Sequence, residues 1–169
     1  MEEKIKLNIA VLTISDSRTK KTDKSGNLLA ELISNSNHNI SEYQIVKDDI
    51  YSIRKTISSW IYNKKINAII STGGTGVTGR DGTPEAVEVL FDKKIDGFGE
   101  IFRYISYKKI KTSTIQSRAT AGVANSTFIF CLPGSPSACK DAWNEIIQYQ
   151  LDSSNKPCNL VELMPKLKD

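Results

Sequence analysis

The feature that most constrains the fold is an alternation of short apolar runs with amphipathic segments in the first half of the chain. Residues 6–15 form a nearly continuous apolar run, which is typical of a strand buried on both faces. Two shorter runs follow at 43–46 and 67–71, and between the runs leucine and isoleucine recur at helical spacing. This β-α-β-α-β order predicts a parallel sheet with helices packed on its faces.

The second half of the chain continues this pattern less regularly. Apolar spacing predicts helices from about residues 84, 98 and 138, and residues 127–132 predict one more strand. Residues 112–125 are rich in small side chains, which favours a helix pressed against a neighbour. Hydroxyl side chains are predicted to cap or open four of the helices, at Ser25, Ser52, Thr83 and Ser137. We therefore expect one domain over residues 1–169, with a core at about 6–151 and an irregular tail at 152–169.

Composition excludes several classes of protein. The 169 residues hold no apolar run near the roughly 20 residues that span a bilayer, and the start at Met1 is no secretion signal, so a cytoplasmic protein is expected. The net charge of +4 is spread along the chain without a dense basic helix, so we expect neither a nucleic-acid partner nor a membrane partner.

Cysteine and histidine are too few for several common kinds of site. Three scattered cysteines fit neither a disulfide framework nor a zinc site, and Cys131 and Cys139 are expected to be buried thiols. The single histidine, His38, lies in a polar run that predicts a surface loop. Histidine-dependent catalytic triads and histidine metal sites are therefore not expected.

A glycine-rich segment, residues 71–85, joins the third predicted strand to the next helix and contains five of the chain's 10 glycines. Such a loop lets backbone amides pass close to a bound anion. The glycine spacing does not match a Rossmann fingerprint, because the helix begins only near Thr83 and Pro84. It does not match a Walker loop either, because Arg80 and Asp81 stand where Lys and Ser or Thr are required.

Charged side chains gather at the predicted carboxyl ends of the strands, where ligands bind in parallel sheets. Beside a phosphate, Asp81 makes most sense as a magnesium ligand, and Asp48 or Asp49 can supply a second carboxylate. The alternatives are that Asp81 closes an Asx-turn and that Asp48 ends a strand. Arginines 18, 80 and 118 fall in loops at strand ends, either as anion ligands or as surface cations. The absence of an evident nucleophile suits phosphoryl or nucleotidyl transfer, which needs positioning and charge neutralisation.

Several motifs in order resemble the signature of the molybdopterin-binding family of molybdenum cofactor biosynthesis proteins. They span residues 72–76 and 80–86 (the loop), 97–103, 117–119 and 132–135, and the likeness extends from Ile9 to about Leu151. Ser113, residues 117–122 and residues 133–135 look most like the protein B branch of that family. The resemblance implies a three-layer α/β/α fold, assembly into trimers or hexamers, and molybdopterin binding at the strand ends.

Active members of this family adenylylate molybdopterin with ATP and Mg²⁺, releasing pyrophosphate, and some protein B members have no clear catalytic role. By resemblance, the essential aspartates are Asp48 and Asp81, as catalytic residues and metal ligands. The substrate-binding residues predicted from the loops and motifs are Ser15, Arg18, Thr72, Gly73, Gly74, Thr75, Gly76, Thr78, Arg80, Thr83, Ser117, Arg118, Pro133, Gly134 and Ser135. The alternative is a non-catalytic molybdopterin-binding or carrier oligomer. Other proteins of the pathway are expected as partners.

Overall fold

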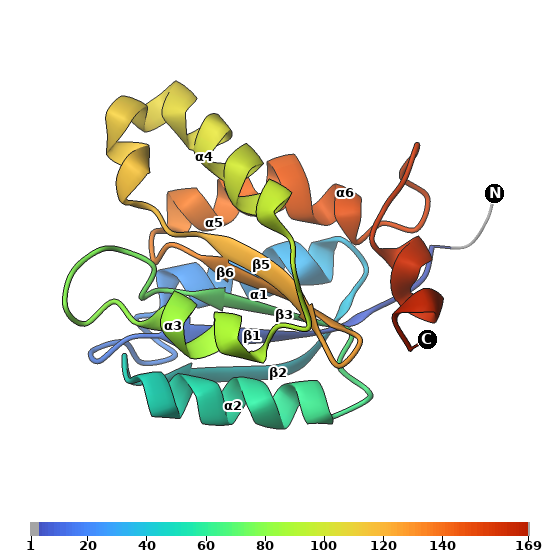
Figure 1. The fold of residues 1–169 in the computed structure, drawn as a ribbon, viewed down its shortest axis with the longest axis horizontal. Coiled ribbons are helices and arrows are strands. Elements are labelled where there is room, and N and C mark those ends of the chain that lie inside the picture. Colours follow the sequence, from blue (N-terminus) through green and yellow to red (C-terminus); the bar gives the residue numbers. More distant parts are fainter. Residues whose placement is uncertain (1–3, 169) are drawn as a thin grey trace.

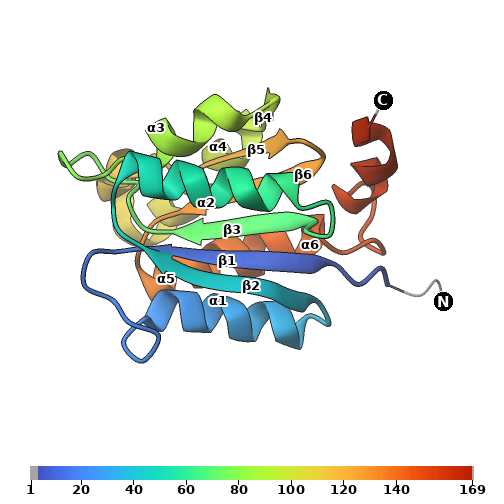
Figure 2. The ribbon, with the colours of Figure 1, turned by 90° about the horizontal axis from the view of Figure 1, so that it is seen from below.

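A computed structural model describes residues 4–168, so Met1 and Asp169, at the predicted start and tail, lie outside the described residues. Its six-stranded sheet has the order β2-β1-β3-β6-β5-β4 (Figures 1 and 2). Four strands are parallel, namely β1 (Asn8–Ile14), β2 (Asn39–Val46), β3 (Ala68–Thr72) and β6 (Thr127–Leu132). At one edge, β5 (Thr120–Ala124) pairs antiparallel with β6, and β4 (Lys93–Lys94) pairs antiparallel with β5. The expected mostly parallel sheet is confirmed.

Helices cover both faces of the sheet and give three α/β/α layers (Figure 1). On one face lie α1 (Lys24–Asn35), α4 (Asp96–Ile110), α5 (Pro136–Ala142), the π-helix η3 (Trp143–Ile147) and α6 (Gln148–Gln150). On the other face lie α2 (Ile50–Tyr62), α3 (Thr83–Val87) and the 3₁₀ helix η1 (Glu88–Leu90). The predicted three-layer fold is therefore confirmed.

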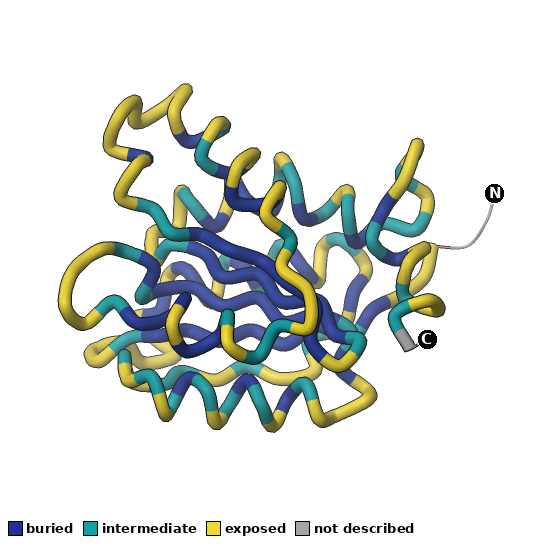
Figure 3. Tube along the Cα trace, in the orientation of Figure 1, coloured by how far each residue is buried: buried dark blue, intermediate teal, exposed yellow. Residues whose placement is uncertain are grey.

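The two layers of helices explain the continuous apolar run of β1. Successive side chains of a strand point to opposite faces, so Ile9 and Val11 pack in the core under α1, while Ala10 and Leu12 pack under α2. The central strands are accordingly buried along their length (Figure 3). A strand between two helical layers therefore favours apolar residues on both of its faces.

Residues 112–125 differ from the prediction of a helix. The chain forms a 3₁₀ helix, η2 (Lys111–Gln116), and then β5, which returns to β6 through a tight turn at Asn125 and Ser126. The small side chains let Phe91 pack directly against β5, because a Cβ at Gly122 would lie 2.4 Å from the ring of Phe91. The sequence pattern indicated the tight packing correctly but not the element that makes it.

The helix starts also lie earlier than predicted. The N-caps are Asp23, Asp49, Gly82 and Ser135, where Ser25, Ser52, Thr83 and Ser137 were predicted. Asp23 and Asp49 accept hydrogen bonds from backbone amides of the first helical turn, which the nearby serines do not do. The chain offers several competent caps in succession, and tertiary packing decides among them.

Two further segments are more ordered than the sequence suggested. His38 lies in the loop between α1 and β2 as predicted, but it is buried, and its Nδ1 accepts a 3.2 Å hydrogen bond from the backbone N–H of Leu7. The tail contains a 3₁₀ helix, η4 (Val161–Lys168), in which Val161 packs into the core. None of the helices within residues 4–168 combines the length and hydropathy that a membrane crossing requires.

Candidate active site at the carboxyl edge of the sheet

The loops that follow β1, β3 and β6 leave the same end of the sheet and enclose a cavity of about 620 Å³. The loop between β1 and α1 and the loop between β3 and α3 are visible together at this end in Figure 1. Of the residues predicted from the sequence, those that line the cavity are Ser15, Arg18, Thr72, Gly73, Gly74, Thr75, Gly76, Asp81, Ser117, Pro133, Gly134 and Ser135. The structure thus brings together most of the predicted set.

Five predicted residues lie around this cavity rather than in its wall: Asp48, Thr78, Arg80, Thr83 and Arg118. Thr83 is fully buried, and its hydroxyl donates a 2.8 Å hydrogen bond to the carbonyl of Gly73. Thr72 lines the cavity, but its hydroxyl donates a 2.8 Å bond to the carbonyl of Pro133. Both hydroxyl protons therefore hold neighbouring loops in place.

One wall of the cavity was not predicted from the sequence. It is formed by α4 and η2, through Phe102, Ser106, Ile110, Ser113 and Gln116. A signal was present, because Phe102, Ser106 and Ile110 are spaced by four residues and so share one helical face. Asp23 and Ser25 also line the cavity, and Ser25 donates a 2.8 Å hydrogen bond to the carbonyl of Gly134.

Glycine is required in the loop at the positions that touch the aspartates. Gly74 has φ +65°, and a Cβ there would lie 2.4 Å from Thr83 Oγ1 and 3.2 Å from Asp48 Oδ1. A Cβ at Gly76 would lie 2.7 Å from Asp81 Oδ2. The backbone of the loop therefore passes directly beside both carboxylates.

Asp48 stands at the end of β2 with one carboxylate oxygen, Oδ1, that is buried and has no hydrogen-bond partner. Burial raises the pKa of Asp48, and the negative charge of Asp81 raises it further. A buried acceptor without a donor is costly, and a bound cation would satisfy it. Asp49, the alternative candidate, is exposed and caps α2 through a 2.7 Å bond from the N–H of Ser52. The structure therefore favours Asp48 over Asp49 as the second carboxylate.

Asp81 is held by its own loop. Its Oδ2 accepts a 2.9 Å hydrogen bond from the N–H of Thr78 and a 2.5 Å bond from the Thr78 hydroxyl. The Thr78 hydroxyl is the main reason that the pKa of Asp81 lies below its usual value. These bonds come from Thr78, three residues earlier, and so differ from the predicted Asx-turn, in which the side chain accepts from an N–H two residues later.

These residues suit magnesium in a particular way. Within residues 4–168 no group of three or more His, Cys, Asp or Glu side chains could hold a metal ion by itself. Mg²⁺ usually binds through one or two carboxylates, and takes its remaining ligands from water and substrate phosphates. The unpartnered oxygen of Asp48 and the ionised Asp81 match that donor set.

The three loop arginines have different surroundings. Arg80 donates from Nη2 to Asp16 Oδ2 at 2.7 Å and to the carbonyl of Asp48 at 3.0 Å, on the exposed side of the loop. Arg18 lines the cavity and donates to the carbonyl of Thr22 at 3.0 Å.

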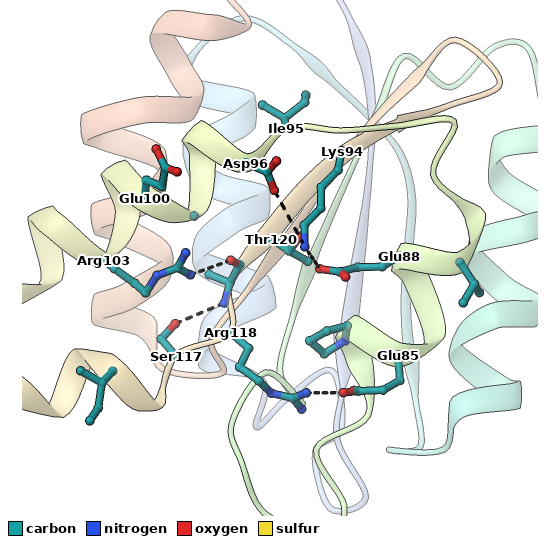
Figure 4. Close-up of a pocket in the computed structure, with 15 residues that line it drawn as sticks. Glu85, Glu88, Lys94, Ile95, Asp96, Glu100, Arg103, Ser117, Arg118 and Thr120 are labelled. Atoms are coloured by element: carbon teal, nitrogen blue, oxygen red, sulfur yellow. Dashed lines mark hydrogen bonds and ion pairs between the residues drawn. The ribbon is translucent and has the colours of Figure 1, made fainter.

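Arg118 lies on the other side of the glycine loop. Its guanidinium contacts the carbonyls of Gly76 and Asp81 and forms an ion pair with Glu85. It faces a second cavity of about 660 Å³ between α3 and α4, in which Lys94 lies between Glu88 and Asp96 (Figure 4). Ser117 lines both cavities, so the segment that begins β5 separates them.

The cysteines take no part in this chemistry. Cys131 and Cys139 are buried as predicted, and burial raises the pKa of the Cys139 thiol to about 11. A neutral thiol at this pKa is a poor nucleophile.

Comparison with known proteins identifies the family. Residues 10–153 match the sequence profile described as a probable molybdopterin binding domain. The chain belongs to the molybdopterin-binding family. The resemblance inferred from the motifs is thereby confirmed.

Similar proteins cover nearly the whole chain. Molybdenum cofactor biosynthesis protein B from Escherichia coli (strain K12) is 46% identical over 157 residues, covering 93% of this chain and 92% of that protein. A crystal structure of a molybdenum cofactor biosynthesis protein B superposes with a TM-score of 0.87 at 39% identity, covering 96% of each chain. The structure of a tungsten cofactor synthesizing protein from Pyrococcus furiosus has a TM-score of 0.81 at 31% identity, covering 97% of this chain and 98% of that one. Within the family, the resemblance to protein B is therefore also confirmed.

Proposed function

We propose that this protein acts in molybdenum cofactor biosynthesis by binding molybdopterin at the carboxyl edge of the sheet and adenylylating it with Mg-ATP. The observation that supports catalysis is the buried, unpartnered Oδ1 of Asp48 beside Asp81 and the glycine loop. Such an arrangement destabilises the protein by itself and becomes favourable when a phosphate-bound cation enters.

The residues divide the work of nucleotidyl transfer among them. Asp48 and Asp81 would hold Mg²⁺, which would neutralise charge on the substrate phosphates. Amides of the glycine loop bind phosphate oxygens, and Arg80 can exchange its exposed contact with Asp16 for a phosphate. The unpredicted wall around Phe102 and Ser106 offers an apolar surface with a hydroxyl for a ring of the substrate.

The reaction needs no protein nucleophile. A phosphate oxygen of molybdopterin attacks the α-phosphorus of ATP and forms the new P–O bond. The bond from the α-phosphorus to the bridging oxygen breaks, and pyrophosphate leaves with the electron pair. The attacking phosphate is already ionised, so positioning and charge neutralisation are the main contributions required of the protein.

The proposal extends to the setting of the enzyme. Its relatives are named for molybdenum or tungsten cofactor synthesis, which supports a role in supplying one of these cofactors. A cytoplasmic location, assembly into trimers or hexamers, and contacts with other proteins of the pathway are proposed from the family resemblance.

Purified protein incubated with molybdopterin and Mg-ATP should form adenylylated molybdopterin and pyrophosphate, both measured by chromatography. Asp48→Asn and Asp81→Asn should each lower turnover by at least about 100-fold, because each removes charge from the metal site. Asp49→Asn is the matched control, since Asp49 is the adjacent carboxylate but caps α2 instead. Tight molybdopterin binding without pyrophosphate release at saturating substrates would refute catalysis and support a carrier role.

A further inference from the structure

Arg118 is directed at the glycine loop and not at the substrate cavity. Its Nε donates to the carbonyl of Gly76 at 2.8 Å, and its Nη2 donates to the carbonyl of Asp81 at 2.8 Å. Nη1 pairs with Glu85 on α3. All three guanidinium nitrogens thus have protein partners, and Arg118 is absent from the wall of the first cavity.

These contacts hold both stems of the loop. Gly76 precedes the exposed tip of the loop, residues 77–80, and Asp81 follows it. One planar group therefore fixes the distance between the two stems, which a flexible ammonium cannot do. The backbone N–H of Arg118 also donates to the carbonyl of Thr75 at 2.9 Å, so main chain and side chain bind the same loop.

We call Arg118, Glu85 and the loop carbonyls that Arg118 binds the clamp. The backbone beside Arg118 is itself held in place. The carbonyl of the next residue, Ala119, accepts a 3.1 Å hydrogen bond from Arg103 of α4. Arg118 directly precedes that residue in the short segment that leads into β5, while Glu85 belongs to the first turn of α3. The clamp joins this segment to α3 through the loop that carries Asp81.

We propose that Arg118 and Glu85 are positioning residues, which orient the glycine loop so that the Asp81 carboxylate faces Asp48. This role rests on the function proposed above and differs from the sequence-based prediction that Arg118 binds substrate. Arg118 acts through the carbonyls of Gly76 and Asp81 and does not touch the reacting atoms. Glu85 keeps the guanidinium in register with those carbonyls.

The test compares Arg118→Gln, Arg118→Lys and Glu85→Gln with a matched control, Arg54→Gln. Arg54 also donates two hydrogen bonds to backbone carbonyls, those of Glu85 and Ala86, but both carbonyls belong to α3 and neither lies within residues 73–82. Hydrogen–deuterium exchange of residues 73–83 should rise at least about tenfold in Arg118→Gln, while exchange in β1 and β6 stays unchanged. Glu85→Gln should show a smaller rise, and Arg54→Gln should leave the exchange of the loop unchanged.

Kinetics separate positioning from substrate binding. Arg118→Gln should lower kcat about 100-fold with little change in the KM of ATP, because the substrate loses no direct contact. Arg118→Lys should recover part of kcat, since an ammonium can bind one of the carbonyls. A large rise in KM with unchanged kcat and unchanged loop exchange would overturn the proposal and make Arg118 a substrate ligand.

The exchange measurement also separates this proposal from the proposed function. If the wild-type protein does not adenylylate molybdopterin, catalysis is refuted. Hydrogen–deuterium exchange of the loop, and Mn²⁺ binding measured by electron paramagnetic resonance, still test the clamp in that case. Weaker Mn²⁺ binding in Arg118→Gln together with faster loop exchange would support positioning of Asp81. Wild-type values of both in Arg118→Gln would refute it.

Discussion

Replacing Gly74 with alanine tests the central geometry of the site. Gly74 has φ +65°, and this left-handed conformation costs a residue with a Cβ about 1–2 kcal/mol. The new methyl group would lie 2.4 Å from Thr83 Oγ1, so the hydrogen bond from that hydroxyl to the Gly73 carbonyl is also disturbed. Losing a buried hydrogen bond of this kind costs about 1 kcal/mol. The free energy of unfolding should therefore fall by about 2–3 kcal/mol in Gly74→Ala.

Thermal unfolding followed by circular dichroism measures this loss directly. For a chain of this size, each kcal/mol lowers Tm by about 2–4 °C, so Tm should fall by about 4–12 °C. Gly79→Ala is the matched control, because a Cβ at Gly79 would have no atom within 4 Å and the φ of Gly79 is outside the left-handed region. Equal melting temperatures for the two variants would refute the requirement for glycine at position 74.

Three further predictions rest on titratable groups. In the metal-free protein at pH 7, Asp48→Asn should raise Tm, because burial raises the pKa of Asp48 and its charge therefore destabilises the fold. Asp81→Asn should lower Tm, because the Thr78 hydroxyl lowers the pKa of Asp81 and its charge therefore stabilises the fold. Thermal melts in EDTA measure both changes. Burial lowers the pKa of His38, so stability should fall as the pH drops below about 6.5, and His38→Asn should flatten that dependence in urea titrations at pH 5.5 and 7.5. In a thiol assay of the folded protein, only the exposed Cys158 should react, and the two buried thiols should react after unfolding.

The parallel half of the fold could be predicted because its local and global signals agree. β1 is apolar from Ile9 to Leu12, as suits a strand covered on both faces, and α2 carries Ile53, Ile57 and Trp60 on one buried face. Because the carboxyl ends of parallel strands meet at one edge of the sheet, the order of β1, β2 and β3 is enough to predict that Ser15, Asp48 and the glycine loop lie together.

The antiparallel edge could not be predicted in the same way. β5 is short and consists mostly of small residues, and its antiparallel pairing with β6 and the approach of Phe91 to Gly122 are seen only in the structure. β4 has two residues, Lys93 and Lys94, and carries no periodic signal at all. The burial of His38 was missed for a related reason, because it depends on a contact with Leu7, which is distant in sequence.

The same limit applies to the arginines of the site. From the sequence, Arg18, Arg80 and Arg118 were equivalent cations at strand ends, since charge and loop position are all that a sequence displays. Their roles differ because of partners far along the chain: Arg80 meets Asp16 on the exposed side, while Arg118 meets two carbonyls and Glu85 behind the loop. An exposed ion pair is worth about 0–1 kcal/mol and can yield to a phosphate, whereas a guanidinium bonded on all three nitrogens holds its place. The loop therefore has a fixed base and an exchangeable tip, which is the arrangement that a site needs if it is to keep Asp81 in position while a charged substrate enters.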